Sequence, residues 1–276
     1  MKLSLDGRLL EASDAALPLD DRGLLLGDGL FETLRAEAGR ALDLEAHLER
    51  LWAGARALKI PLPEADLPRA IDALLAANGL SQGGAALRIT LTRGSGPRGL
   101  LPPSAPRPRL FMTAVAWTPP PREPLRAILA GVRRNEHSPL SRLKTLNYLD
   151  NVLARLEAEE RGADEALMLN TAGRLVCATA ANLFLVRGRR LFTPPVTEGV
   201  LPGIARASVL DLAPRLDLSV AEVPLEPAQL WEADEAFLTN SLIGLRSVVE
   251  VDGRAIGDVA PGPVTVRLKE ALDGLR

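Results

Sequence analysis

The chain has few cysteines, few aromatic residues and no long apolar stretch. Its 276 residues include one cysteine, Cys177, which excludes an internal disulfide framework. Aromatic residues make up only 3% while hydrophobic residues reach 47%, so the core must be built mainly from Leu, Ala and Val. No stretch approaches the ~18 uninterrupted apolar residues of a membrane span. The first residues also lack the apolar segment of a signal peptide, so we expect a cytoplasmic protein.

Charge and length narrow the classes further. The net charge is −2 with both signs interspersed, which gives no footprint for nucleic acid or for an acidic membrane surface. At this length two domains are favoured over one. Residues 117–124 (WTPPPREP) cannot form a helix or a central strand, so we expect a linker there. The predicted domains are therefore residues 1–116 and residues 125–276.

Helical and strand patterns alternate in both halves, which predicts an α/β fold. A hairpin is expected at residues 3–10, where an Asp-Gly pair forms the turn. The predicted helices cover 44–58, 65–77 and 147–161, and another begins after the Pro-Gly pair at 202–203. The predicted strands are 29–36, 86–93, 110–116, 165–169, 175–177, 182–186, 218–223, 235–239 and 248–251.

Lysine is also scarce, because only four of the 33 basic residues are lysines. One of them, Lys144, lies just before the predicted helix 147–161. Unlike a guanidinium, a lysine amine can form an imine with an aldehyde. A lysine before a helix is also common as a plain surface residue. If Lys144 has a chemical role, pyridoxal phosphate is the cofactor that requires it, together with a phosphate cradle and a partner for the pyridine nitrogen.

Candidate parts of a phosphate cradle occur in three places. The Pro-Gly pair at 202–203 opens a helix, which leaves the backbone amides of Ile204 and Ala205 to face an anion. Residues 239–241 (TNS) end a predicted strand and offer hydroxyl and amide donors. Arg50 at the edge of the first long helix adds a positive charge. Each signal alone also fits an ordinary helix start, turn or solvated charge.

Together the motifs resemble one family in their order and local sequence. They are residues 21–33 (DRGLLLGDGLFET), 47–51 (HLERL), 143–147 (LKTLN), 181–184 (ANLF), 201–204 (LPGI) and 237–241 (FLTNS). This series resembles the fold-type IV pyridoxal-phosphate enzymes, which include branched-chain aminotransferases, D-amino acid aminotransferases and aminodeoxychorismate lyases. The resemblance implies the two-domain α/β fold of D-amino acid aminotransferase, pyridoxal phosphate as cofactor, a small amino substrate with a carboxylate, and a homodimer.

The resemblance also implies a role for each matching residue. Lys144 would form the Schiff base and then act as the general base. The residues implied to contact the cofactor are Arg50, Ile204, Ala205 and Ser241 at the phosphate, together with Tyr148, Cys177 and Asn240. Tyr148 follows Asn147 as a cofactor-contacting tyrosine does in the branched-chain members, although it could equally be a packed helix residue.

Position 177 departs from the family pattern. A glutamate that pairs with the pyridine nitrogen normally lies five residues before the Asn of the Asn-Leu-Phe segment, and counting back from Asn182 gives Cys177. A neutral thiol there would leave the ring a weaker electron sink. A thiolate stabilised by the ring's charge would partly restore the glutamate's role. In the third alternative the local register differs and another carboxylate fills the site.

The substrate motifs favour the lyases over the other members. Residues 86–88 (ALR) lack the tyrosine of the Tyr-x-Arg pair of branched-chain aminotransferases, and the chain has no Arg-x-His carboxylate trap. Residues 92–99 (TRGSGPRG) resemble the lyase loop, although a solvated hairpin turn is the alternative. We expect Arg98 to bind a substrate carboxylate, with Arg88 or Arg93 as a second anchor and Phe31 as a further substrate contact.

Three functions therefore stay open at this point. The first is an aminodeoxychorismate lyase, which forms p-aminobenzoate and pyruvate. The second is an aminotransferase for D-amino acids or for small or branched-chain amino acids, weakened by Cys177. The third is a pyridoxal-phosphate-binding protein with little catalysis.

Overall fold

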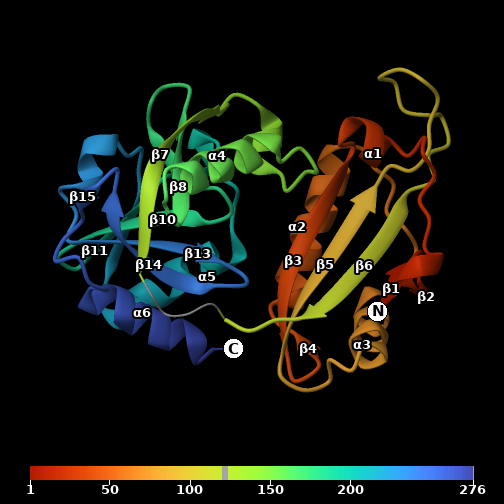
Figure 1. The fold of residues 1–276 in the computed structure, drawn as a ribbon, viewed down its shortest axis with the longest axis horizontal. Coiled ribbons are helices and arrows are strands. Elements are labelled where there is room, and N and C mark those ends of the chain that lie inside the picture. The colour runs from red at the N-terminus through yellow and green to blue at the C-terminus, as the bar shows by residue number, and fades with distance from the viewer. Residues whose placement is uncertain (120–123, 276) are drawn as a thin grey trace. The chain divides into compact units, whose positions relative to one another are not determined.

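The computed structural model describes residues 1–119 and 124–275, and the chain divides into two compact units (Figure 1). The first unit comprises Met1–Pro119 and Leu143–Asn147, and the second comprises Pro120–Arg142 and Tyr148–Arg276. Of the predicted linker 117–124, residues 120–123 lie outside the described part of the chain. The segment that carries Lys144 belongs to the first unit, whereas the sequence placed it in the C-terminal domain.

The first unit is built on a six-stranded sheet in which neighbouring strands run antiparallel. In spatial order its strands are β2 (Arg8–Glu11), β1 (Lys2–Leu5), β6 (Arg109–Ala116), β5 (Gly84–Thr92), β3 (Gly29–Glu37) and β4 (Arg40–Ala41). Its helices are α1 (Arg22–Leu26), α2 (Leu44–Ala57) and α3 (Leu67–Ala77). Both long helices contribute to one hydrophobic core with β3, β5 and β6, so they cover the same face of the sheet.

The periodicity of α3 shows why this core forms. Leu67, Ile71, Leu74 and Leu75 recur at helical spacing and are all at most 2% exposed. Burying each such side chain contributes roughly 1.5–3 kcal/mol relative to leaving it in water. Asp66 accepts a hydrogen bond from the Arg69 amide and so caps the first turn of α3.

The second unit contains a nine-stranded sheet that closes on itself. In spatial order the strands are β12 (Ser219–Glu222), β11 (Arg190–Thr193), β10 (Asn182–Arg187), β13 (Glu235–Asn240), β14 (Gly244–Val251), β7 (Leu125–Arg134), β8 (Glu165–Asn170) and β9 (Leu175–Ala178), with β15 (Arg254–Ala255) on β14. The ring closes because β9 also pairs with β10, with Cys177 opposite Asn182.

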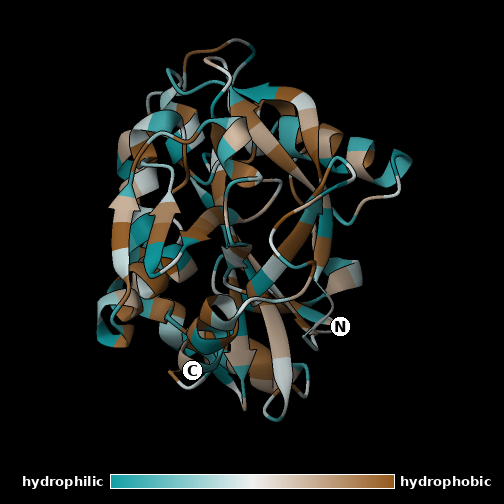
Figure 2. Cartoon of the chain, turned by 90° about the vertical axis from the view of Figure 1, so that its left-hand side faces the viewer, coloured by the Kyte–Doolittle hydropathy of each residue, from teal (hydrophilic) through white to brown (hydrophobic). Residues whose placement is uncertain are grey.

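Alternating side chains divide the second unit into an interior and a helix-covered exterior. On β10, Leu183 and Leu185 belong to the cluster inside the ring, whereas Phe184 and Val186 pack with α5 (Ile204–Leu212) and α6 (Pro263–Asp273). Phe184 stacks on a neighbouring strand's Phe237 with ring centroids 4.9 Å apart. Hydrophobic and hydrophilic segments follow one another along the strands and helices (Figure 2).

The third helix of this unit, α4 (Leu149–Glu160), packs on another part of the ring. It contributes Ala154 and Ala158 to a small apolar cluster that includes Cys177. In the described part of the chain, no helix has the length and apolar character needed to cross a bilayer.

Candidate functional site

The segment that carries Lys144 continues the sheet of the first unit. The Phe31 amide donates to the Lys144 carbonyl at 2.9 Å, and the Leu146 amide donates to the Gly29 carbonyl at 3.0 Å. Thr145 forms an isolated bridge with Leu30 between these two bonds. The backbone on both sides of Lys144 is therefore fixed to β3.

The Phe31 ring brings Lys144 and Arg88 together. The ring centroid lies 4.4 Å from Lys144 Nζ and 3.9 Å from Arg88 Cζ. Phe31 is buried, and Arg88 comes from the neighbouring strand β5. An aromatic face attracts cations within about 6 Å of its centroid. Two of the predicted substrate residues, Phe31 and Arg88, thus lie beside the predicted nucleophile.

On β3 the next residue, Glu32, orients Arg50 from α2. Arg50 donates from Nε to Glu32 Oε1 at 2.8 Å and from Nη2 to Oε2 at 2.7 Å, which is a bidentate ion pair. His47 Nδ1 lies 2.7 Å from the same Oε2. Burial raises the pKa of the Glu32 carboxyl, but the hydrogen bonds from Arg50 and His47 outweigh burial and the pKa lies below its usual value. Neither Glu32 nor His47 was given a role from the sequence, although both belong to the motifs that resemble the family.

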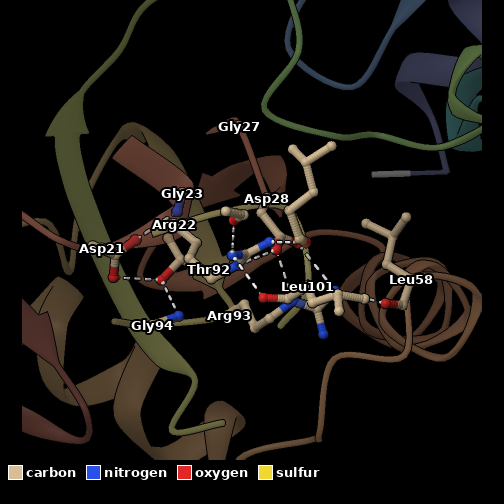
Figure 3. Close-up of polar contacts among 12 residues, drawn as sticks. Asp21, Arg22, Gly23, Gly27, Asp28, Leu58, Thr92, Arg93, Gly94 and Leu101 are labelled. Atoms are coloured by element: carbon tan, nitrogen blue, oxygen red, sulfur yellow. Dashed lines mark hydrogen bonds and ion pairs between the residues drawn. The ribbon is translucent and has the colours of Figure 1, made fainter. Parts of the chain in front are cut away.

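Asp28 forms a second charged centre of the first unit (Figure 3). Its Oδ2 accepts hydrogen bonds from Arg22 Nε at 2.8 Å and from Arg93 Nε at 2.7 Å, and its Oδ1 accepts one from Arg93 Nη2 at 3.0 Å. Burial raises the pKa of the Asp28 carboxyl, yet the hydrogen bonds from Arg93 and Arg22 bring it below the usual value. The carboxylate therefore stays charged and pairs two buried guanidiniums.

These contacts correct the expected role of Arg93. Besides Asp28, the Arg93 guanidinium donates to the carbonyls of Lys59 at 2.8 Å and Leu58 at 2.7 Å. Its donors are used inside the unit, so Arg93 is a structural residue and not the second carboxylate anchor. The sequence could not distinguish it from Arg88, which lies on the same strand-and-loop segment.

The predicted substrate loop is tied to the same centre. Arg22 donates to the carbonyls of Gly99 at 3.0 Å and Leu100 at 2.8 Å. At Gly94, where φ is +84°, a Cβ would lie 1.9 Å from the Arg107 carbonyl oxygen, so only glycine fits. Arg98 between these points is exposed. The loop is thus held at both ends, and Arg98 is presented at its surface.

The start of α5 in the second unit contains the backbone amides that were predicted to bind phosphate. Gly203 is the N-cap residue, and within the described residues no side chain caps this end. A Cβ at Gly203 would lie 1.9 Å from Asn182 Oδ1, while Asn182 Nδ2 donates to the Leu201 carbonyl at 2.9 Å. Glycine is therefore required by close packing, and the amides of Ile204 and Ala205 open the helix. A dianionic phosphate fits these donors.

The turn after β13 holds the remaining phosphate candidates. Asn240 Oδ1 accepts from the amides of Leu242 at 3.0 Å and Ile243 at 2.9 Å, and its Nδ2 donates to the Ala180 carbonyl at 3.1 Å. The Asn240 side chain thus shapes the turn that contains the half-buried Ser241. Direct contact of that side chain with a cofactor would have to replace one of these backbone bonds.

Cys177 is buried in β9, within the apolar cluster that also contains Val200. Burial raises the pKa of its thiol, and the positive charge of Arg134 lowers it by less. The thiol is therefore neutral near pH 7, which disfavours the thiolate alternative in the protein itself. Tyr148 is half-buried at the residue before α4.

Comparisons with known proteins identify the family to which the chain belongs. Residues 29–251 match the family model described as amino-transferase class IV. A putative branched-chain-amino-acid aminotransferase of Methanocaldococcus jannaschii is 38% identical over 100% of this chain and 96% of its own length. A D-alanine aminotransferase of Bacillus licheniformis is 31% identical over 99% of this chain and 96% of its own. The crystal structure of 4-amino-4-deoxychorismate lyase from Pseudomonas aeruginosa has a TM-score of 0.88 and 37% identity, covering 99% of this chain and 98% of that one.

The chain therefore belongs to the class IV aminotransferase family and has its fold. It is an enzyme, and its cofactor is pyridoxal phosphate. These comparisons include both aminotransferases and a lyase, so the family alone leaves the substrate open.

Proposed function

We propose that this protein is an aminodeoxychorismate lyase, which converts 4-amino-4-deoxychorismate to p-aminobenzoate and pyruvate. The observation that carries the proposal is the Phe31 ring, which lies against both the Lys144 amine and the Arg88 guanidinium. A nucleophilic amine beside a carboxylate-binding group suits a substrate with an amine and carboxylates. The lyase is favoured over other amino-group chemistry by the loop at 92–99 and by the similarity to the Pseudomonas aeruginosa lyase.

The residues of this chain fit the cofactor as follows. Lys144 binds it covalently, and Arg50, whose guanidinium is oriented by Glu32, binds its phosphate. In the second unit, the Ile204 and Ala205 amides at the start of α5 are proposed as further donors to the phosphate. The further proposed contacts are Ser241, Asn240 through the turn that it shapes, Tyr148 and, at the pyridine nitrogen, Cys177.

Pyridoxal phosphate, when bound, supplies an aldehyde carbon that bonds to the substrate amine and a ring that accepts electrons from the carbon bearing that amine. Lys144 Nζ would be the base that removes the proton from the carbon bearing the substrate amine. Loss of pyruvate and aromatisation of the substrate ring then supply the driving force. Because aromatisation is so favourable, we expect a lyase to tolerate the neutral thiol of Cys177 better than an aminotransferase would.

Two arginines are proposed to bind the substrate carboxylates. Arg88 lies beside Lys144 and binds the carboxylate nearer the reacting amine. Arg98 is exposed on a loop whose ends are fixed, and we propose that it binds the second carboxylate. A bidentate guanidinium–carboxylate pair gives geometric selectivity as well as affinity.

A class IV aminotransferase acting on D-amino acids or on small or branched-chain amino acids is the second candidate. It is favoured by the relatives from Methanocaldococcus jannaschii and Bacillus licheniformis, both of which bear aminotransferase names. The two candidates differ in what happens to the cofactor. Transamination leaves it in the amine form, whereas the lyase reaction returns it unchanged.

A product assay distinguishes the candidates. The protein loaded with pyridoxal phosphate is incubated with aminodeoxychorismate, and p-aminobenzoate and pyruvate are measured. We expect equal amounts of both products, no activity in Lys144→Ala, and a raised KM in Arg88→Gln. No turnover, together with conversion of the cofactor by D-alanine or a branched-chain amino acid, would make the protein an aminotransferase. A cofactor that no amino donor converts would leave only a binding function.

We further propose that the protein is a cytoplasmic homodimer, as the family resemblance implies. The support in the structure is an apolar stripe on α4, where Leu149, Val152, Leu153 and Leu156 are 75%, 48%, 54% and 49% exposed. Their spacing is that of a seam between helices, and a second copy of the chain would present the same stripe. Light scattering should give twice the chain mass, and a monomer mass would overturn this assignment.

A further inference from the structure

Arg134, the last residue of β7, joins two loops that are distant in sequence. Its Nε donates to the Gly199 carbonyl at 2.7 Å, and its Nη2 donates to the Ser141 carbonyl. Gly199 begins the loop that leads to α5, and Ser141 lies three residues before Lys144. One guanidinium therefore fixes the loop before the proposed phosphate site and the segment from which the chain continues to the lysine.

The residues after Arg134 contact the same two loops. Ser141 Oγ donates to the Asn135 carbonyl at 2.7 Å. At Gly199, where φ is +87°, a Cβ would lie 3.0 Å from Glu136 Cα, so the two backbones approach closely. The end of β7 is thus a junction, and the Arg134 guanidinium donates a hydrogen bond to each of the two loops.

In the part of the chain that the structure describes, no ion pair neutralises the charge of Arg134. Among the described residues, no carboxylate lies within ion-pair distance of its guanidinium. Its charge acts instead on the nearby Cys177, whose thiol pKa it lowers against the larger effect of burial. The carbonyls that hold this guanidinium carry no net negative charge, so its positive charge also favours a nearby anion.

We propose that Arg134 is a positioning residue for the cofactor phosphate, which it serves by holding the loop at Gly199 to the segment at Ser141. The inference rests on the proposed role of the α5 amides as the phosphate site. Loss of both hydrogen bonds would release the loop before Gly203, and the amides that follow would no longer be preorganised for the dianion.

The test compares the affinities of the protein for pyridoxal phosphate and for pyridoxal, which lacks the phosphate. Dissociation constants are measured from the visible absorbance of the bound cofactor. In Arg134→Gln we expect the preference for pyridoxal phosphate to fall about tenfold, as expected for loss of hydrogen bonds from a charged group. General loosening of the fold would weaken both ligands equally and leave the ratio unchanged, which would overturn the proposal.

The neighbouring Arg133 provides a matched control. Its Nη1 also donates to a backbone carbonyl, that of Ala130 at 2.8 Å, but it is exposed and contacts neither loop. Arg133→Gln should keep the wild-type ratio. If Arg134→Gln does not fold, Arg134→Lys decides: an ammonium lacks the planar fork of the guanidinium, so its ratio should also fall, and a wild-type ratio would contradict the inference.

Arg50→Gln tests the proposed phosphate site independently of the proposed role of Arg134. If Arg50→Gln lowers the ratio and Arg134→Gln does not, the phosphate site stands and the role of Arg134 is wrong. If neither variant changes the ratio, the proposed phosphate site itself is wrong.

Discussion

Arg93 in the first unit and Arg134 in the second both donate hydrogen bonds to two backbone carbonyls, but only Arg93 also pairs with a carboxylate. At Arg93 the carboxylate is Asp28, which Arg22 shares. Near Arg134 the corresponding group is the neutral thiol of Cys177.

The two arginines therefore belong to different kinds of centre. The charges around Arg93 are balanced by Asp28, whereas the charge of Arg134 is not balanced by a carboxylate among the described residues. Around Asp28 the charges are paired and the donors are used, so this centre fixes the loop at Gly99 but offers little to a ligand. Arg134 also holds two backbone carbonyls, yet its positive charge remains beside the loop that leads to α5. Since the cofactor brings a dianionic phosphate, a positive charge beside this loop favours its binding.

Removing the carboxylate at Asp28 should give the largest effect on stability. In Asp28→Asn the buried Arg22 and Arg93 lose their common counter-ion, and breaking a buried pair in this way costs about 3–5 kcal/mol. We expect the free energy of unfolding in urea to fall by this amount.

Asp217→Asn is the control for this experiment. The Asp217 side chain pairs with Arg189 at 3.5 Å and is 84% exposed, so its removal should change stability by less than about 1 kcal/mol. Equal effects of the two substitutions would show that the Asp28 centre is not the structural element that its geometry indicates.

Replacing Cys177 with glutamate puts a carboxylate near Arg134, as Asp28 is near Arg93. In Cys177→Glu we expect a glutamate to pair with the pyridine nitrogen and strengthen the electron sink, which raises the rate of half-transamination with an amino donor about tenfold, or about 1.4 kcal/mol in the barrier. The rate is measured by stopped-flow absorbance of the cofactor.

Cys177→Ser keeps a small neutral group and should leave that rate unchanged. No gain in Cys177→Glu would mean that position 177 does not face the pyridine nitrogen and that the register of β9 differs from the family pattern. The buried thiol would then be only a core residue.

The sequence predicted those helices and strands whose pattern lies within a few consecutive residues. The Asp-Gly hairpin, the helical stripe of α3 and the strands β3 and β5 follow from short-range patterns, and they are found close to where they were expected. The sequence did not predict β7 or α6. β7 (LRAILAGVRR) contains Gly and charged residues, and α6 (PVTVRLKEALD) begins with residues that favour strands.

The same limit applies to the site. Motif order predicted the family and its cofactor, and it gave Lys144 as the nucleophile and Arg88 or Arg93 as a substrate anchor. The structure brings Lys144 and Arg88 to one ring. It could not separate Arg88 from Arg93, because the ion pair of Arg93 with Asp28 joins residues that are distant in sequence. For the same reason it missed Arg134, whose partners lie on two other loops.

A substitution at Glu136 should give the smallest effect on stability, and it tests whether Arg134 differs from Arg93 in lacking a carboxylate partner. It lies two residues after Arg134, yet its Oε2 accepts hydrogen bonds from the amide and hydroxyl of Thr171, at 3.0 and 2.8 Å, and it does not pair with Arg134. Its own backbone amide and those bonds lower the pKa of the Glu136 carboxyl to about 2. Since the unfolded carboxyl has a pKa of about 4.3, the ionised group stabilises the fold above that pH, and the contribution is lost as the pH falls towards about 2.

Glu136→Gln should therefore lower the unfolding midpoint slightly at pH 7, and the difference from wild type should vanish near pH 2. Midpoints measured across this range isolate the group, because the other carboxyls titrate in both proteins. The contact with Gly199 uses the Glu136 backbone, so the variant should keep the wild-type preference for pyridoxal phosphate over pyridoxal. A changed preference would mean that the Glu136 carboxylate partly neutralises Arg134, and the contrast between the two arginines would then be one of degree.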